Sequence, residues 1–163
     1  MANLILIAST AQCLEDFGHL ADRLREEEHT PVVMTSHDSS ASRLQKECSG
    51  KQFALVGIMG EPNEIAIGFE ALRVIADRCY RTAVGICLDA EGYKFYTRQK
   101  YMPDVLRIRC AVLVGEPEAF PHARSIVRIG GKRTLVQNDW SSEELETVAN
   151  AIADEVGRRI VAA

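Results

Sequence analysis

The chain has 163 residues, a net charge of −4 and 47% hydrophobic residues. This length accommodates one domain with a full core but hardly a second, so we expect residues 1–163 to form a single domain. The acidic balance and the lack of Lys/Arg runs disfavour nucleic acid as a partner, because phosphate backbones are held by basic side chains. No apolar run approaches the roughly 18 residues that span a bilayer. We therefore expect a cytoplasmic protein with no membrane partner.

The five cysteines are odd in number and show no C-x-x-C spacing. Neither a disulfide framework nor a zinc site is indicated, and we expect no metal ion. Three of them stand in apolar strand or helix positions, which is typical of small reduced core residues.

The first two thirds of the chain alternate between two patterns. Short continuous apolar runs predict strands that are covered on both faces, and apolar residues at helical spacing predict helices between them. The predicted strands are 4–8, 31–35, 53–59, 82–88 and 110–114, and the helices between the first four of them are 11–28, a segment ending at 48, and 64–80.

The last third carries two further signals. Gly130-Gly131 separates two β-prone runs in residues 125–136, which favours a hairpin over a phosphate-binding loop. Ser141 and Glu144 form a capping box that opens a final amphipathic helix. We expect this helix to pack across the sheet.

The order of elements predicts the fold class. Short connections between successive strands require parallel crossovers, and right-handed crossovers build a doubly wound sheet. We expect an α/β protein with a three-layer α/β/α sandwich and a five-stranded parallel sheet in the flavodoxin-like order 2-1-3-4-5. The 125–136 hairpin, or a strand there, would be an appendage.

Polar residues follow several predicted strands directly. Ser9 and Thr10 follow the first, His37 and Asp38 the second, and Asn63 the third. Because the carboxyl ends of parallel strands share one sheet edge, we expect these residues to line one cleft that binds substrate. Ser9 and Thr10 also suit plain helix capping, the more common use of such residues.

A basic and aromatic run, residues 93–102, follows the fourth strand. Such a run suits either a clamp that stacks on a nucleotide or a half-buried lid. In the first interpretation Tyr96 contacts the substrate.

Glu70 lies in the predicted helix 64–80, between Ile67 and Val74, two turns after Asn63 on the same face. A carboxylate beside apolar neighbours would be partly desolvated, which raises its pKa and suits a group facing an electron-poor sugar carbon. The alternative is a surface ion pair with Arg73, three residues further on.

The Pro62-Asn63 turn, the segment 68–72 around the glutamate and the segment 102–107 resemble the nucleoside 2-deoxyribosyltransferase-like group, which is related in fold to the nucleotide-cleaving Toll/interleukin-receptor (TIR) domains. The resemblance implies attack by Glu70 on the sugar carbon of a nucleoside, nucleotide or NAD, with release of the base by hydrolysis or transfer and without a cofactor. It leaves the group's second acidic residue unmatched, although Asp38 and Asp89 both follow strands. Association of identical chains stays open.

Two other functions are compatible with the same elements. Ala8-Ser9-Thr10-Ala11 could form a phosphate-cradling turn for FMN in a flavodoxin-like binding protein. A non-catalytic TIR-like signalling or scaffold domain is the third hypothesis.

Overall fold

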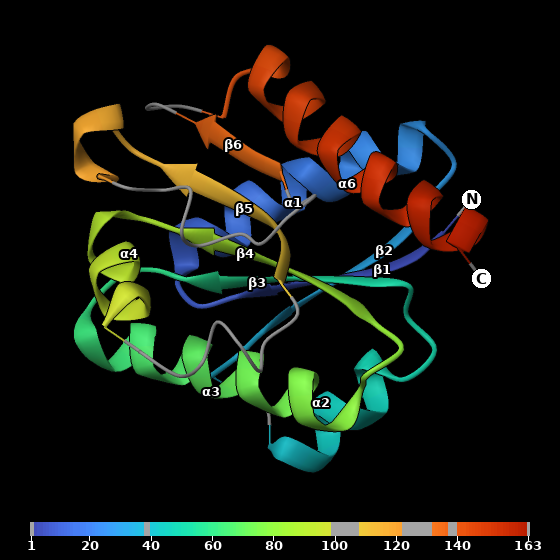
Figure 1. The fold of residues 1–163 in the computed structure, drawn as a ribbon, viewed down its shortest axis with the longest axis horizontal. Coiled ribbons are helices and arrows are strands. Elements are labelled where there is room, and N and C mark those ends of the chain that lie inside the picture. The colour runs from blue at the N-terminus through green and yellow to red at the C-terminus, as the bar shows by residue number, and fades with distance from the viewer. Residues whose placement is uncertain (1, 38–39, 99–107, 122–131, 137–139, 163) are drawn as a thin grey trace.

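The structure is a computed structural model that describes residues 2–37, 40–98, 108–121, 132–136 and 140–162 (Figure 1). In chain order its elements are β1 (Asn3–Ala8), α1 (Ala11–Glu26), β2 (Thr30–Thr35), α2 (Ala41–Cys48), β3 (Phe53–Ile58), α3 (Pro62–Arg78), β4 (Ala83–Leu88), α4 (Ala90–Thr97), β5 (Ile108–Val114), a short 3-10 helix (Pro117–Ala119), β6 (Lys132–Val136) and α6 (Ser142–Ala162).

All of these strands belong to one sheet in the order β2-β1-β3-β4-β5-β6, and every neighbouring pair is parallel. The predicted order 2-1-3-4-5 is therefore confirmed. The sheet continues by one strand beyond it, because β6 pairs along its length with β5 and is part of the sheet, not an appendage. The first arm of the predicted 125–136 hairpin lies outside the described residues.

The sheet is the middle of three layers. In Figure 1, α1 and α6 cover one face of the sheet, and α2, α3 and α4 cover the other. The strands β3 and β4 are buried at every position, as expected for central parallel strands with helices on both sides. Each face has its own continuous apolar cluster.

Two glycines allow helices to lie directly on the carboxyl end of β3. A Cβ on Gly68 of α3 would collide with the carbonyl oxygen of Gly57, and a Cβ on Gly92 of α4 would collide with that of Ile58. These close approaches fix the second turn of α3 and the first turn of α4 against the end of β3, which is the edge where ligand sites of such sheets lie.

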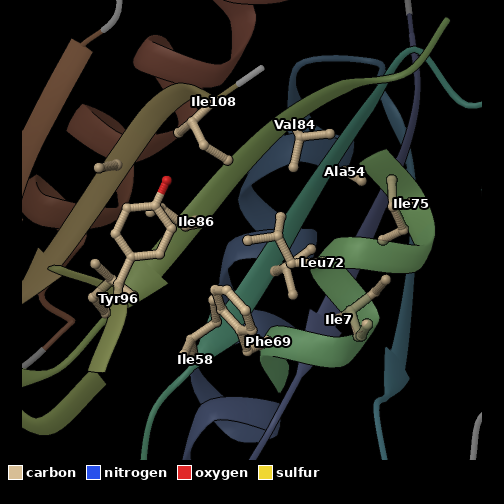
Figure 2. Close-up of a cluster of buried hydrophobic side chains, with 14 of the residues drawn as sticks. Ile7, Ala54, Ile58, Phe69, Leu72, Ile75, Val84, Ile86, Tyr96 and Ile108 are labelled. Atoms are coloured by element: carbon tan, nitrogen blue, oxygen red, sulfur yellow. The ribbon is translucent and has the colours of Figure 1, made fainter. Parts of the chain in front are cut away.

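Tyr96 is fully buried in the core under α4. Its ring meets Phe69 of α3 edge-on at a centroid distance of 6.3 Å, and Figure 2 shows the Tyr96 ring beside Ile86 and Phe69 among the apolar side chains on this face of the sheet. The side chain is therefore covered in this structure, and the predicted contact of Tyr96 with a substrate stays a prediction. Within the described residues, no helix has the length and apolar character needed to cross a membrane.

Candidate functional site

The turn after β1 consists of Ser9 and Thr10, between the strand end at Ala8 and the helix start at Ala11. The Ser9 side chain is fully buried. Its hydroxyl donates to the carbonyl oxygen of Met59 at 3.0 Å and accepts from the Met59 amide at 3.2 Å. Ser9 therefore joins the end of β1 to the end of β3. Its hydroxyl both donates and accepts a hydrogen bond within the protein.

Thr10 is the N-cap of α1, and its Oγ1 accepts from the amide of Cys13 at 2.9 Å. Its methyl group lies against Gly60, where a Cβ would collide with it and where φ is +102°. Only glycine adopts such a backbone angle without strain, so the Gly60 turn can approach Thr10 this closely. Capping, the alternative weighed for this hydroxyl, is what the structure contains.

His37 connects the turn after β2 to the turn after β1. Its Nε2 lies 2.7 Å from the carbonyl oxygen of Ser9, and since a carbonyl oxygen can only accept, Nε2 carries the hydrogen in this contact. The same nitrogen lies 3.8 Å from Oε2 of Glu64, whose side chain is 25% exposed. His37 therefore does lie at the predicted edge, beside Ser9, together with a carboxylate that the sequence did not single out.

Glu64 has a second role at the start of α3. Its Oε1 accepts from the amide of Glu61 at 3.0 Å and completes a capping box with Glu61. The three-residue spacing of Glu61 and Glu64 before an apolar helix is the sequence signal that would have identified this residue.

Asp89, the single residue between β4 and α4, joins two neighbouring turns. Its Oδ2 accepts from the Gly60 amide at 2.9 Å and its Oδ1 accepts from the Gly92 amide at 2.7 Å. Both oxygens are thus occupied by backbone donors, which indicates a structural carboxylate that caps α4 and holds the Gly60 turn.

Two further predicted site residues, Asn63 and Glu70, are exposed on α3. Asn63 is exposed in the first turn of α3. Asp38 lies outside the described residues. Glu70 is 67% exposed at its side chain and lies 3.4 Å from the guanidinium of Arg73, which is the surface ion pair and not a desolvated carboxylate.

An open cleft of about 340 Å³ lies between the Gly60 turn and α4. The cleft is lined by Gly60, Glu61, Pro62 and Ile65 on one side and by Glu91, Lys94, Phe95 and Arg98 on the other. Phe95 meets Phe69 edge-on at 5.3 Å, so its ring is held in place by the core. Lys94 and Glu91 approach to 3.3 Å and both are exposed. The cleft thus offers an aromatic wall, a proline, two cations and two carboxylates, Glu61 and Glu91.

The cysteine nearest the site is not a nucleophile. Burial raises the pKa of the Cys13 thiol to about 12, so it stays protonated near neutral pH. Among the described residues no cluster of three or more His, Cys, Asp and Glu side chains could hold a metal ion.

No family model matches the chain, and no curated protein matches it. Solved structures do match. The rubredoxin oxygen:oxidoreductase of the anaerobe Desulfovibrio gigas has a TM-score of 0.61 over 97% of this chain at 16% identity. The flavodiiron protein from Giardia intestinalis has a TM-score of 0.55 over 98% of this chain at 12% identity.

This chain covers 36% of each of those two chains, so it corresponds to only part of their length. A flavodoxin from the domain Archaea aligns over 98% of this chain and 99% of its own, with a TM-score of 0.46 and 10% identity. At these identities the first two matches show a shared fold.

These matches correct the resemblance to the nucleoside 2-deoxyribosyltransferase-like and TIR-like proteins, because the fold is shared with a flavodiiron protein and a rubredoxin oxygen:oxidoreductase. The hypothesis of N-glycosidic cleavage by Glu70 is wrong with it. The motifs that suggested it were short, and a proline in the first turn of a helix that follows a strand is a general helix-start signal.

Proposed function

We propose that this chain is a flavodoxin-like domain that binds FMN, with the flavin ring in the cleft between the Gly60 turn and α4. The observation that carries the proposal is the composition and position of that cleft. It lies between the turn after β3 and α4, and it shares Gly60 with the neighbouring point between β1 and β3 where the strand order reverses, because Gly60 also lies against Thr10. Ligands bind at that point in doubly wound sheets of this order.

The residues of the cleft fit a flat aromatic ligand. Phe95, Pro62 and Ile65 supply apolar surface for a ring. A volume of about 340 Å³ lies at the lower end of the range for small-molecule sites. Fold similarity to a flavodiiron protein, whose name refers to a flavin, adds support.

The turns around the cleft are short. Three residues connect β3 to α3 and one residue connects β4 to α4, so these two described turns supply little chain to cover a ligand. We expect the ring to lie with one side open to solvent and the affinity to fall in about the micromolar range, because few contacts offset the cost of immobilising the ligand. When bound, the flavin would supply one- and two-electron transfer.

Titration of the purified chain with FMN, followed by flavin fluorescence and by the visible spectrum, tests the proposal. We expect saturable quenching and a shifted visible band. Phe95→Ala should weaken binding by about fivefold, because a stacked aromatic contact is worth about 1 kcal/mol. Its matched control is Tyr80→Ala, which removes an aromatic ring that is 65% exposed and outside the cleft. Absence of saturable binding at flavin concentrations up to about a millimolar would reject FMN and leave the scaffold hypothesis.

A further inference from the structure

A second pocket lies at the opposite edge of the sheet from the cleft, at the amino ends of β3 and β4. It is formed by the turn after α2, which leads into β3, and by the turn after α3, which leads into β4. In Figure 1 these two turns lie at the right end of the sheet, whereas α4 lies at the left. The pocket has a volume of about 180 Å³, and its lining includes Gln45, Ser49, Arg78, Tyr80, Arg81 and Thr82.

The charge of this lining differs from that of the cleft. Arg78 and Arg81 both contribute to it, and none of the described residues that line the pocket is a carboxylate. The acidic residues next to the two turns in the sequence, Glu47 and Asp77, are not among the lining residues. The pocket therefore presents two positive charges in a chain whose net charge is −4.

Arg78 is held by a neutral partner. One of its N–H groups donates to Oε1 of Gln45 at 3.4 Å. By contrast Arg73, an exposed arginine of the same helix, lies 3.4 Å from the carboxylate of Glu70. The contact with Gln45 orients the Arg78 guanidinium without neutralising its charge, so this cation can attract an anion.

The two turns are linked to each other in the absence of a ligand. The Thr82 hydroxyl lies 3.0 Å from the carbonyl oxygen of Lys51 and 3.2 Å from that of Cys48. Sγ of Cys79, which also lines the pocket, lies 3.8 Å from the carbonyl oxygen of Gln45. These links position the lining residues in advance, which lowers the cost of immobilising them around a ligand.

The carboxyl ends of α2 and α3 adjoin the pocket and bring partial negative charge. Each helix end carries about half an elementary charge, which is less than the charge of one arginine. The carbonyl oxygens of Gln45 and Cys48 already accept from the backbone amides of Ser49 and Lys51. Positive charge therefore prevails at the lining.

Tyr80 adds an aromatic surface to the two cations. Its side chain is 65% exposed although it lines the pocket. Tyrosine and arginine are the residue types that most often contribute binding energy at recognition sites. Because about 180 Å³ is less than the usual volume of a small-molecule site, we expect the pocket to hold only the charged group of a ligand and the Tyr80 ring to contact the rest.

We propose that this pocket binds the phosphate group of a small phosphate monoester, with Arg78 and Arg81 as its cations and the Tyr80 ring beside an aromatic part of the ligand. Guanidinium groups match phosphate oxygens with paired, charge-assisted hydrogen bonds. The Ser49 hydroxyl and the Gln45 side-chain amide supply further donors at the lining. The site is separate from the cleft and does not depend on the FMN function.

Titrations with inorganic phosphate and with phenyl phosphate at constant ionic strength test the proposal, read by the NMR shifts of the backbone amides. Both ligands should bind saturably and shift the amides of residues 49–51 and 79–82. We expect a Kd of about a millimolar for inorganic phosphate and about fivefold tighter binding of phenyl phosphate, because its ring contacts Tyr80.

Variants assign the contributions of the lining residues. Arg78→Gln and Arg81→Gln should each weaken the binding of both ligands several-fold. Tyr80→Ala should remove the preference for phenyl phosphate and leave the affinity for inorganic phosphate unchanged. Arg73→Gln is the matched control, because it removes an exposed arginine of α3 outside the pocket, and it should change neither affinity.

Three results would overturn the proposal. The first is the absence of saturable shifts in residues 49–51 and 79–82 at ligand concentrations up to about 20 mM. The second is an Arg78→Gln variant, folded by circular dichroism, that binds as tightly as the wild type or no more weakly than Arg73→Gln. The third is a set of shifts confined to the Gly60 turn and α4, which would place the phosphate in the cleft.

Discussion

Ser9→Ala tests the central link of the candidate site, the connection between the ends of β1 and β3. The hydroxyl makes two hydrogen bonds to Met59, at 3.0 and 3.2 Å, and the Ser9 side chain is fully buried. Two neutral hydrogen bonds contribute about 2 kcal/mol together, and leaving the Met59 amide without this acceptor adds a desolvation cost of about 1 kcal/mol. We expect the free energy of unfolding to fall by about 2–3 kcal/mol.

For a chain of this length that change corresponds to a fall in Tm of about 5–10 °C, measurable by thermal or urea unfolding followed by circular dichroism. Ser40→Ala is the matched comparison, because the Ser40 hydroxyl caps α2 at an exposed position and accepts from the Arg43 amide at 3.2 Å. Its loss should cost about 1 kcal/mol. A Ser9→Ala variant that is destabilised no more than Ser40→Ala would show that the buried link adds nothing beyond an ordinary cap.

Three further predictions concern stability. Gly60→Ala should lower the free energy of unfolding by about 2–4 kcal/mol in urea, because its φ of +102° is strained for alanine and the added methyl has no room. Glu70→Gln should change it by less than about 0.5 kcal/mol, since the exposed pair with Arg73 is a surface ion pair; a loss above about 1 kcal/mol would contradict that interpretation. Stability should also fall as the pH rises above about 9, because burial raises the thiol pKa of Cys13 and Cys110 to about 12 and the unfolded chain then binds fewer protons than the folded one. Urea unfolding between about pH 8 and 10 checks this slope, which replacement of both thiols by alanine should reduce.

The central strands were predictable because burial on both faces leaves continuous apolar runs, such as 53–59, which polar turns delimit. The strand β6 was harder to assign. Gly130-Gly131 is a local signal for a hairpin, whereas the observed partner of β6 is β5, reached through a long connection. Local turn chemistry contains no information on a parallel partner of that kind.

Only part of the cleft lining was predictable from the sequence, because residues of one run can lie on different faces of a helix. The basic and aromatic run after β4 was interpreted as a clamp or a lid, and the structure divides it by helix face. Tyr93 and Tyr96, three residues apart, are buried, while Lys94 and Arg98 face the cleft. Helical spacing places Tyr93 and Tyr96 on one face and Lys94 and Arg98 on another, so this periodicity alone is enough to assign Tyr96 to the core.

The solvent exposure of the Glu70 carboxylate could not be predicted from the residue pattern of its own helix. Its neighbours Ile67 and Val74 are apolar, which suggested a desolvated carboxylate, but desolvation depends on what covers the helix from outside. The covering helix α2 has only 8 residues against 17 in α3, and the two leave an open apolar hollow of about 350 Å³ where Glu70 lies. The Glu70 side chain is 67% exposed, so water reaches the carboxylate, and this depends on the packing of a neighbouring helix that the residues around Glu70 do not reveal.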